Sequence, residues 1–352
     1  MPDADLPAPP PAADRVRWRD RLLLPPAPED TAVITGCPAR VPVRRDVPVT
    51  DPVSGHASTA AVWEYAADDG SAHRSGMAAA LPRTLVVVHG FRGDHHGLAL
   101  LADCLPEHRI LSVELPGFGA SPAFPAAEHT VAHHADALRQ AVAGLVLDPP
   151  PVLVAHSYGS VVAAHAVAEA ATTAAPLTDR LALLNPIAEP ARDASGSLLA
   201  RGLAAAARGY YGLAAALPER ASRALLGAPP VVLATTLAMS RTRSRAVLGH
   251  THDQHRRYFS AFSSAAMLAE AYRGSSAGTV LEVADRLTLP VLLVAGRQDP
   301  LGSPVAQRAL ADAVAAAGGV PELHVLDGVG HLLHYERAPE CAALLRSWLA
   351  GP

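Results

Sequence analysis

The sequence contains no lysine, and all 29 of its basic residues are arginine. Enzymes that form a Schiff base with a carbonyl substrate need the lysine amine. Phosphate-binding loops of the Walker type use a lysine to reach the phosphates of a nucleotide. The absence of lysine therefore excludes both classes of mechanism for this chain.

Cysteine is also scarce, with three residues, Cys37, Cys104 and Cys341. An odd number at such wide spacing fits neither a disulfide framework nor a zinc site. We expect these residues to pack in the core of a protein from a reducing compartment, and we expect no metal or other cofactor. The formal net charge of -4 gives no electrostatic footprint for nucleic acid.

Long apolar runs are missing as well. The N-terminal stretch combines early acidic residues and many prolines with one short apolar run, Leu22 to Leu24, which is not the pattern of a signal peptide. No stretch approaches the roughly 18 uninterrupted apolar residues that a membrane span requires. We therefore expect a cytoplasmic protein that acts on a small-molecule substrate and has no membrane or nucleic-acid partner.

The chain has the length and hydrophobicity to bury a large core, with 352 residues of which half are hydrophobic. Residues 1–32 are rich in proline and alanine and predict an arm without regular structure. In residues 33–188 and 284–352, short apolar runs alternate with helical periodicity, which predicts an α/β core with a mostly parallel sheet flanked by helices. Residues 189–283 are rich in alanine, leucine and arginine and predict an inserted helical lid.

The expected strands and helices follow from these apolar runs and from helical spacing. Two N-terminal strands, Val41–Val49 and Ala60–Tyr65, are separated by a turn and predict an antiparallel hairpin at a sheet edge. The later expected strands are Leu85–Val88, Ile110–Leu115, Val152–Ala155, Leu181–Leu184, Pro290–Ala295 and Glu322–Leu326. The expected helices are Val131–Val146, Ser160–Ala171, Leu198–Ala207, Pro218–Leu226, Tyr258–Tyr272, Pro304–Ala317 and Pro339–Leu349.

The motif that organises the chain is PVLVAHSYGSVVAA, residues 151–164. A short apolar run leads into a tight turn with Ser157 at its tip, and small and branched residues follow that can continue as a helix. Such a corner lifts a serine hydroxyl out of the sheet and aims the first free helix amides at whatever the hydroxyl attacks. Ser157 is therefore the candidate nucleophile, and the amide of Tyr158 is a candidate donor to a developing oxyanion.

A serine hydroxyl needs a neutral imidazole within hydrogen-bond reach to take its proton. The chain has 17 histidines, and His331 lies in a glycine-containing turn directly after the last expected strand. Groups that meet a ligand emerge from the carboxyl ends of the strands in an open α/β sheet, which favours His331 as the base. His334 is the fallback, and His324 lies within the strand, where packing is the better interpretation.

The imidazole in turn needs an acid that holds it in one tautomer. Asp299 follows the strand before the last one and has the right position along the chain. Glu189 and Asp327 are the competing acids, although Asp327 belongs to an Asp-Gly pair of the kind that forms turns. The order of Ser157, Asp299 and His331, on this strand and helix pattern, resembles the α/β-hydrolase superfamily from about residue 83 onward.

The resemblance is to the serine-nucleophile, lid-containing branch, and it implies the α/β-hydrolase fold with a catalytic triad of Ser157, Asp299 and His331. It also implies a second oxyanion donor in the loop after the Leu85–Val88 strand. There the chain has His89-Gly90-Phe91, which favours the Phe91 amide, with that of Arg92 second. His89 itself is expected to hold the loop rather than to act as an acid or base.

Other polar motifs are alternative candidate sites. The motif HTHDQH, with His250, His252, Asp253 and His255, does not have the spacing of a helical zinc site and predicts a polar face of the lid. The run Asp94-His95-His96 could ligate a metal, but a hydrogen-bonded loop is the more common outcome. The alternating arginines could anchor a carboxylate, but we expect them to face water; they are Arg241, Arg243 and Arg245.

The resemblance also narrows the reaction. Haloalkane dehalogenases and epoxide hydrolases have aspartate at the elbow, so Ser157 disfavours both. The lid contains Tyr210, Tyr211, Met239 and Met267, which predicts an apolar pocket and makes a small, largely apolar carboxylic ester the leading substrate.

A carbon-carbon bond hydrolase of ring-fission products is the main alternative hypothesis, because residues 296–299, Gly-Arg-Gln-Asp, resemble the corresponding segment of those enzymes. Their elbow usually reads Ser-Met-Gly-Gly, whereas this one reads Ser-Tyr-Gly-Ser. A lyase or receptor on the same fold is the non-hydrolytic alternative.

Overall fold

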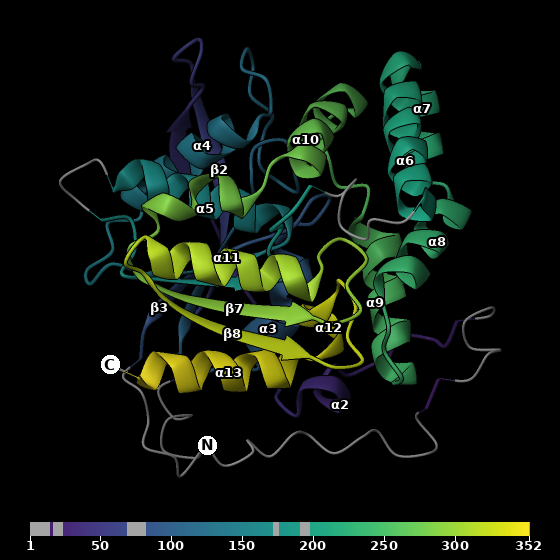
Figure 1. Ribbon diagram of the computed structural model, residues 1–352. Helices are drawn as coiled ribbons and strands as arrows, with labels where there is room; N and C mark the ends of the chain where they lie inside the picture. Colours follow the sequence, from purple (N-terminus) through teal and green to yellow (C-terminus); the bar gives the residue numbers. More distant parts are fainter. Residues whose placement is uncertain (1–14, 17–23, 69–81, 172–175, 191–197, 352) are drawn as a thin grey trace.

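The computed structural model describes residues 15–16, 24–68, 82–171, 176–190 and 198–351 (Figure 1). Its centre is an eight-stranded sheet in the order β1-β2-β4-β3-β5-β6-β7-β8. From β4 to β8 every pair of neighbours runs parallel, as expected where strands are joined by helical crossovers. The predicted fold class, a mostly parallel α/β sheet, is confirmed. Most of the expected arm, residues 1–32, lies outside the described residues, as does the segment 69–81.

The strands form close to where their apolar runs predict them. Their bounds are β1 Val43–Thr50, β2 Ala57–Tyr65, β3 Thr84–Val88, β4 Arg109–Val113, β5 Val152–His156, β6 Arg180–Leu184, β7 Pro290–Gly296 and β8 Val320–Leu326. β1 and β2 make the antiparallel hairpin expected at the sheet edge, and β2 also pairs antiparallel with β4. The hairpin turn is tied to the rest of the fold, because the Asp51 carboxylate accepts from the amides of Ser54 and Ala127.

Helices cover both faces of the sheet. Along β3, Val86 and Val88 contribute to one apolar cluster, and Leu85 and Val87 contribute to the other, so the strand is buried on both sides. In Figure 1, α11 and α5 lie on one side of the sheet and α13 lies on the other. The helices of this core are α2 Ala32–Thr35, η2 His95–Leu98, α3 Ala99–Asp103, α4 Val131–Gly144, α5 Tyr158–Ala170, η3 Val280–Arg286, α11 Pro304–Ala316, α12 Leu333–Glu336 and α13 Ala338–Ala350.

A helical insertion separates β6 from β7. It consists of α6 Leu198–Ala216, α7 Glu219–Leu226, α8 Pro229–Met239, α9 Arg245–Tyr258 and α10 Ala265–Ala277. Figure 1 shows α6 to α9 beyond the arrowheads of β7 and β8. The insertion therefore lies at the carboxyl edge of the sheet, where ligands of α/β folds bind.

One expected helix of this insertion, Tyr258–Tyr272, is wrong. α9 ends at Tyr258, and α10 begins only after Ser264, whose hydroxyl accepts from the amide of Met267. The serine cap provides a helix start that the apolar spacing alone conceals. Among the described residues, no single helix is both long and apolar enough to cross a membrane, whereas the bent pair α7 and α8 meets that test only jointly.

Candidate active site

The sharp turn between β5 and α5 carries Ser157. Its backbone has φ of 53° and ψ of -122°, a conformation that a residue with a side chain adopts only at a free-energy cost. The turn is tight because α5 lies against β3: a Cβ on Gly159 would lie 2.5 Å from the carbonyl oxygen of His89. Glycine at position 159 therefore permits the approach that projects Ser157 beyond the strand end.

The structure brings together the three side chains expected from the sequence. The Oγ of Ser157 lies 2.7 Å from Nε2 of His331. On the other side of the ring, Nδ1 lies 2.9 and 3.0 Å from the two carboxylate oxygens of Asp299. The side chains of His331 and Asp299 are only 7 % and 2 % exposed. A buried carboxylate at this position fixes the imidazole with its Nδ1 protonated, so that Nε2 is free to accept the serine proton.

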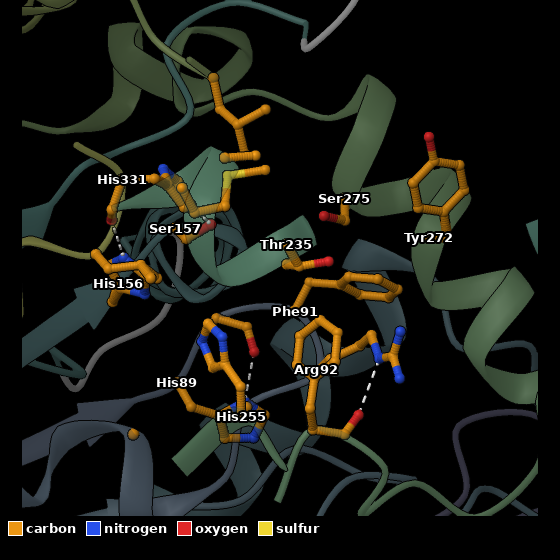
Figure 2. A pocket seen from close by; sticks show the side chains of 18 of the residues that line it. His89, Phe91, Arg92, His156, Ser157, Thr235, His255, Tyr272, Ser275 and His331 are labelled. Carbon is orange, nitrogen blue, oxygen red and sulfur yellow. Dashed lines mark hydrogen bonds between the residues drawn. The ribbon is translucent and has the colours of Figure 1, made fainter. Parts of the chain in front are cut away.

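Asn185 holds the histidine loop in place, a role that the sequence analysis missed. Its side-chain amide donates to the carbonyls of Gly330 and His331 at 2.9 and 2.8 Å, and its Oδ1 accepts from the amide of Gly296 at 2.7 Å. His156 adds a bond from Nε2 to the carbonyl of His331 at 3.0 Å (Figure 2). Asn185 is a polar residue directly after β6, and that position is the sequence signal that could have identified it.

The insertion is also bonded to the histidine loop. The amide of His331 donates to the carbonyl of Met239, the last residue of α8, at 2.8 Å. The carboxylate of Glu336 accepts from the amides of Gly330 and Arg241 at 3.0 and 2.8 Å. Burial raises the pKa of Glu336 to about 7. The helical insertion is thus bonded to the candidate base directly through Met239 and is linked through Glu336 to the preceding residue, Gly330.

The two expected oxyanion donors follow Ser157 and β3 along the chain. Tyr158 is the first residue of α5, and Phe91 lies in a turn closed by a bond from the Gly93 amide to the Gly90 carbonyl at 3.0 Å. Among the described residues, neither amide has a hydrogen-bond acceptor. The Tyr158 ring points into the core, where its hydroxyl lies 2.8 Å from Nδ1 of His134. The side chain of Tyr158 is therefore not available to a ligand.

Ser157, His331 and Phe91 line a cavity of about 800 Å³ between the sheet and the insertion. Aromatic rings cover part of it: Phe91 meets Tyr211 edge on at 5.5 Å, and Tyr211 stacks on Tyr272 at 4.2 Å. Figure 2 shows Tyr272 and Ser275 across the cavity from His156 and His331. Tyr210 and Met239 also line the cavity, whereas Met267 is buried elsewhere, near Gly117.

Histidines form a second part of the cavity wall. His255 lies 2.9 Å from the hydroxyl of Thr236, and burial lowers its pKa to about 3. Burial also lowers the pKa of His334 well below its ordinary value, and its Nδ1 has no hydrogen-bond partner in the described part of the chain. Both imidazoles are therefore neutral near pH 7. The polar lid face expected for the HTHDQH motif is wrong for these positions, since His250 and His255 are buried.

His89 holds the loop that contains the expected donor Phe91, in agreement with the prediction. Its Nδ1 lies 2.8 Å from the carbonyl of Gly90, and its Nε2 accepts from the amide of Leu115 at 3.0 Å. Burial lowers the pKa of His89. Both ring nitrogens are thus committed to the backbone, which leaves none for acid or base chemistry.

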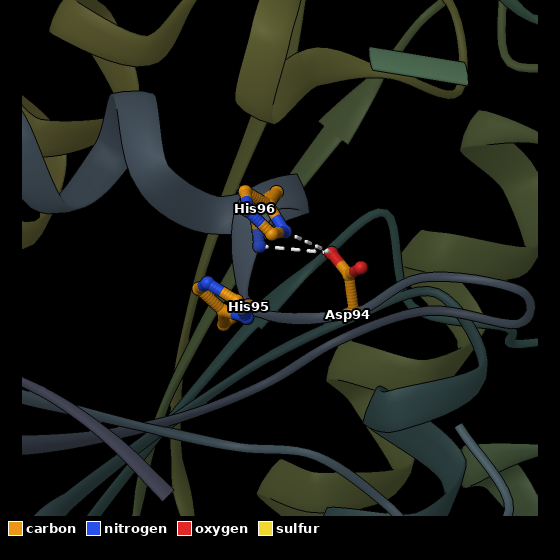
Figure 3. A group of neighbouring side chains, drawn as sticks. All are labelled: Asp94, His95 and His96. Atoms are coloured by element: carbon orange, nitrogen blue, oxygen red, sulfur yellow. Dashed lines mark hydrogen bonds and ion pairs between the residues drawn. The ribbon is translucent and has the colours of Figure 1, made fainter. Parts of the chain in front are cut away.

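The neighbouring run Asp94-His95-His96 has side-chain atoms close enough to one another to suggest a metal site (Figure 3). Asp94 accepts from the amide of His96 at 2.9 Å and lies 3.1 Å from its Nδ1. Nδ1 of His95 lies 2.7 Å from Glu114, and its ring stacks on Trp63 at 3.8 Å. Hydrogen bonds and ring contacts account for this arrangement, which matches the expected hydrogen-bonded loop.

The remaining candidates are not among the described residues that line the cavity. Asp327 is exposed and pairs with Arg297, and Glu189 accepts from the amide of Ser303 at 2.8 Å. His324 lies 2.6 Å from Glu322 on the edge strand β8. The expectation that Arg241 faces water is wrong, because this half-buried side chain donates to the carbonyls at the end of α8, including that of Ala238 at 2.9 Å.

Comparison with known proteins gives a family and a fold. Residues 85–344 match the model of the alpha/beta hydrolase family. A search of curated protein sequences found no match.

Similar solved structures include an esterase from Thermogutta terrifontis, with 19 % identity, a TM-score of 0.64, and coverage of 87 % of this chain and 98 % of that one. An esterase from Exiguobacterium antarcticum has 14 % identity, a TM-score of 0.65, and coverage of 88 % and 100 %. E-2-(acetamidomethylene)succinate hydrolase has 15 % identity, a TM-score of 0.61, and coverage of 88 % and 100 %. At these identities the likeness concerns the fold alone.

Proposed function

The chain belongs to the alpha/beta hydrolase family, and we propose that it is a serine hydrolase that cleaves a small, largely apolar carboxylic ester through an acyl-enzyme. The observation that carries the proposal is the continuous set of hydrogen bonds from Ser157 through His331 to Asp299 at the wall of the cavity. Hydroxyl, imidazole and carboxylate in this order are what nucleophilic attack by serine requires.

In the proposed reaction, Oγ of Ser157 attacks the carbonyl carbon of the ester while Nε2 of His331 takes the hydroxyl proton. Asp299 stabilises the imidazolium that forms, and the amides of Phe91 and Tyr158 donate to the negative carbonyl oxygen. Collapse of this tetrahedral intermediate breaks the bond to the alcohol, which leaves with the proton from His331. Water then attacks the acyl group on Ser157 by the same steps and releases the carboxylic acid.

The cavity supports an apolar substrate class. The rings of Phe91, Tyr211 and Tyr272 offer an apolar surface to one part of a ligand. On the histidine side, burial keeps His255 and His334 neutral, so a group bound there gains hydrogen bonds but no ion pair. An uncharged ester with an apolar part fits both the aromatic side and the histidine side of the cavity.

The nucleophile is tested with a serine-directed fluorophosphonate probe. We expect the wild-type protein to be labelled and Ser157→Ala to be unlabelled, because phosphonylation needs the activated hydroxyl. Ser275→Ala is the matched control, since Ser275 lines the same cavity, and it should label normally. A folded wild-type protein that does not label would favour a receptor or another non-hydrolytic role.

The reaction is tested with a panel of p-nitrophenyl esters of increasing acyl length beside a ring-fission dienone. We expect turnover of the esters, with a preference for apolar acyl groups over charged ones of equal length. Turnover of the dienone alone would replace the ester proposal by carbon-carbon bond hydrolysis on the same three residues.

A further inference from the structure

Arg92 is a buried residue that the proposed reaction leaves without a role. It follows Phe91 in the turn closed by Gly90 and Gly93, and it is only 4 % exposed. As the third residue of this turn it has φ of 60°, in the left-handed region that such turns normally assign to glycine. The backbone of the turn therefore disfavours arginine at this position, so contacts of the side chain must offset that cost.

That side chain reaches from the turn at residues 90–93 into the insertion. Its Nε donates to the carbonyl of Phe259 and one Nη donates to the carbonyl of Leu226, both at 2.9 Å. The guanidinium also lies 3.7 Å from the centroid of the Phe259 ring, a cation-π distance. Figure 2 shows Arg92 beside Phe91, on the side of the cavity away from His331.

Both acceptors stand at helix ends. Leu226 is the last residue of α7, and Phe259 is the first residue after α9. Carbonyls at the end of a helix have no partner within it and carry the negative end of the helix dipole. The positive guanidinium therefore satisfies two helix ends at once, and it joins two helices of the insertion to the residue that follows Phe91.

We propose that Arg92 is a positioning residue that couples the insertion to the oxyanion site: it holds the Phe91 amide in the orientation that the developing oxyanion needs only while α7 and α9 are in place. The inference rests on the proposed function, because it assigns Phe91 as a donor. It explains why a strained turn position carries a long, buried, charged side chain. It also makes the insertion part of the catalytic geometry rather than only a cover.

The test compares Arg92→Gly, Arg92→Lys and Arg223→Met with the wild-type protein. Glycine suits the backbone of the turn and removes only the side-chain contacts with the insertion. Lysine keeps a positive charge but lacks the planar guanidinium that bonds two carbonyls. Arg223 is the matched control, because it donates to the carbonyls of Phe262 and Ser263 and lies 5.0 Å from the Phe262 ring, all within the insertion.

For Arg92→Gly we expect kcat to fall about 10- to 100-fold, the effect of a small displacement of a catalytic group, with KM changed by less than about threefold. Arg92→Lys should recover part of the loss, and Arg223→Met should stay near wild type. A trifluoromethyl ketone, which forms a tetrahedral adduct with the serine, should lose affinity in proportion to kcat/KM, because its oxyanion uses the same donors.

Three results would overturn the inference. The first is a wild-type kcat in Arg92→Gly, and the second is an equal loss of kcat in Arg223→Met. The third is a rise in KM confined to substrates with a carboxylate, which would make Arg92 an anion-binding group. If Arg92→Gly does not fold, as judged by thermal melting, the kcat and inhibitor affinity of Arg92→Lys decide the matter. Fluorophosphonate labelling of the wild type separates this inference from the proposed function. If the wild type is labelled and Arg92→Gly keeps its kcat, the coupling is rejected but the serine hydrolase proposal stands.

Discussion

At the scale of single residues, the candidate acid has competitors that also follow strands of the sheet. Asp299 and Asp327 each follow one of the last two strands, yet only Asp299 reaches the imidazole, at 2.9 Å. The Asp327 side chain is 77 % exposed and pairs with Arg297. The two carboxylates differ in burial and in distance from the imidazole. Only the buried Asp299 is placed to fix the imidazole tautomer and stabilise the imidazolium.

We therefore predict that Asp299→Asn lowers kcat for the ester substrate by about 10³- to 10⁴-fold, since the amide favours the wrong imidazole tautomer. Asp327→Asn, the matched control, should leave kcat within about twofold, because a surface ion pair contributes little. Initial rates at saturating substrate measure both. An equal loss in the two variants, or none in Asp299→Asn, would reject Asp299 as the orienting acid.

At the scale of elements, the contact between α5 and β3 determines the position of Ser157. Glycine at position 159 lets the helix approach the strand, because a Cβ would lie 2.5 Å from the carbonyl oxygen of His89 and 2.7 Å from that of Val88. Both oxygens belong to the backbone and cannot rotate away. The helix would have to shift, and Ser157, one residue before its start, would shift with it.

We predict that Gly159→Ala destabilises the protein by about 1 to 3 kcal/mol, the range for an over-packed core, and slows labelling of Ser157 by the fluorophosphonate probe. The control is Gly212→Ala in α6, where a Cβ would meet nothing within 4 Å. It should instead raise the free energy of unfolding by up to about 1 kcal/mol through helix propensity. Urea unfolding and labelling rates measure the two effects, and equal stability of both variants would contradict the argument.

At the scale of the whole molecule, many histidines are buried in neutral form. Burial lowers the pKa of His134, His156 and His255 to about 3 and that of His250 to about 4. Between these values and about 6.5 the unfolded chain binds protons that the folded protein does not. The histidines therefore stabilise the fold above pH 6.5, and this stability is lost as the pH falls.

Two buried acids act in the opposite direction. Burial raises the pKa of Glu336 to about 7 and that of Asp103 to about 6. The folded protein binds their protons at a pH where the unfolded chain has released them, so their contribution to stability falls as the pH rises through that window. Because the shifted histidines outnumber these two acids and their shifts extend further, we expect the net effect to be loss of stability on acidification.

We predict that the free energy of unfolding, measured in urea at pH 7.5, 6 and 5, falls with decreasing pH. In His250→Phe the slope between pH 6 and 5 should be smaller by up to about 1.4 kcal/mol per pH unit, the contribution of one proton. The control is His56→Gln, because His56 is exposed in the folded protein, and its slope should match the wild type. Identical slopes for all three proteins would contradict the role of the buried histidines.

The sequence by itself determined the alternation of strands and helices and the order of the candidate nucleophile, acid and base. Apolar runs, turn glycines and the serine elbow are local patterns, so they predicted seven of the strands to within about two residues, with only the start of β2 further off. The same patterns named Ser157, Asp299 and His331, which the fold then brought within hydrogen-bond distance of one another.

Only the tertiary structure decided the contacts between segments far apart in the chain. Asn185 and Glu336 bind the histidine loop, Arg92 reaches α7 and α9, and Met239 accepts from His331. The sequence also failed in the insertion, where the break between α9 and α10 depends on the cap at Ser264. The physical reason is the same in each case: burial and hydrogen-bond partners are set by which elements pack together, and no local pattern records that.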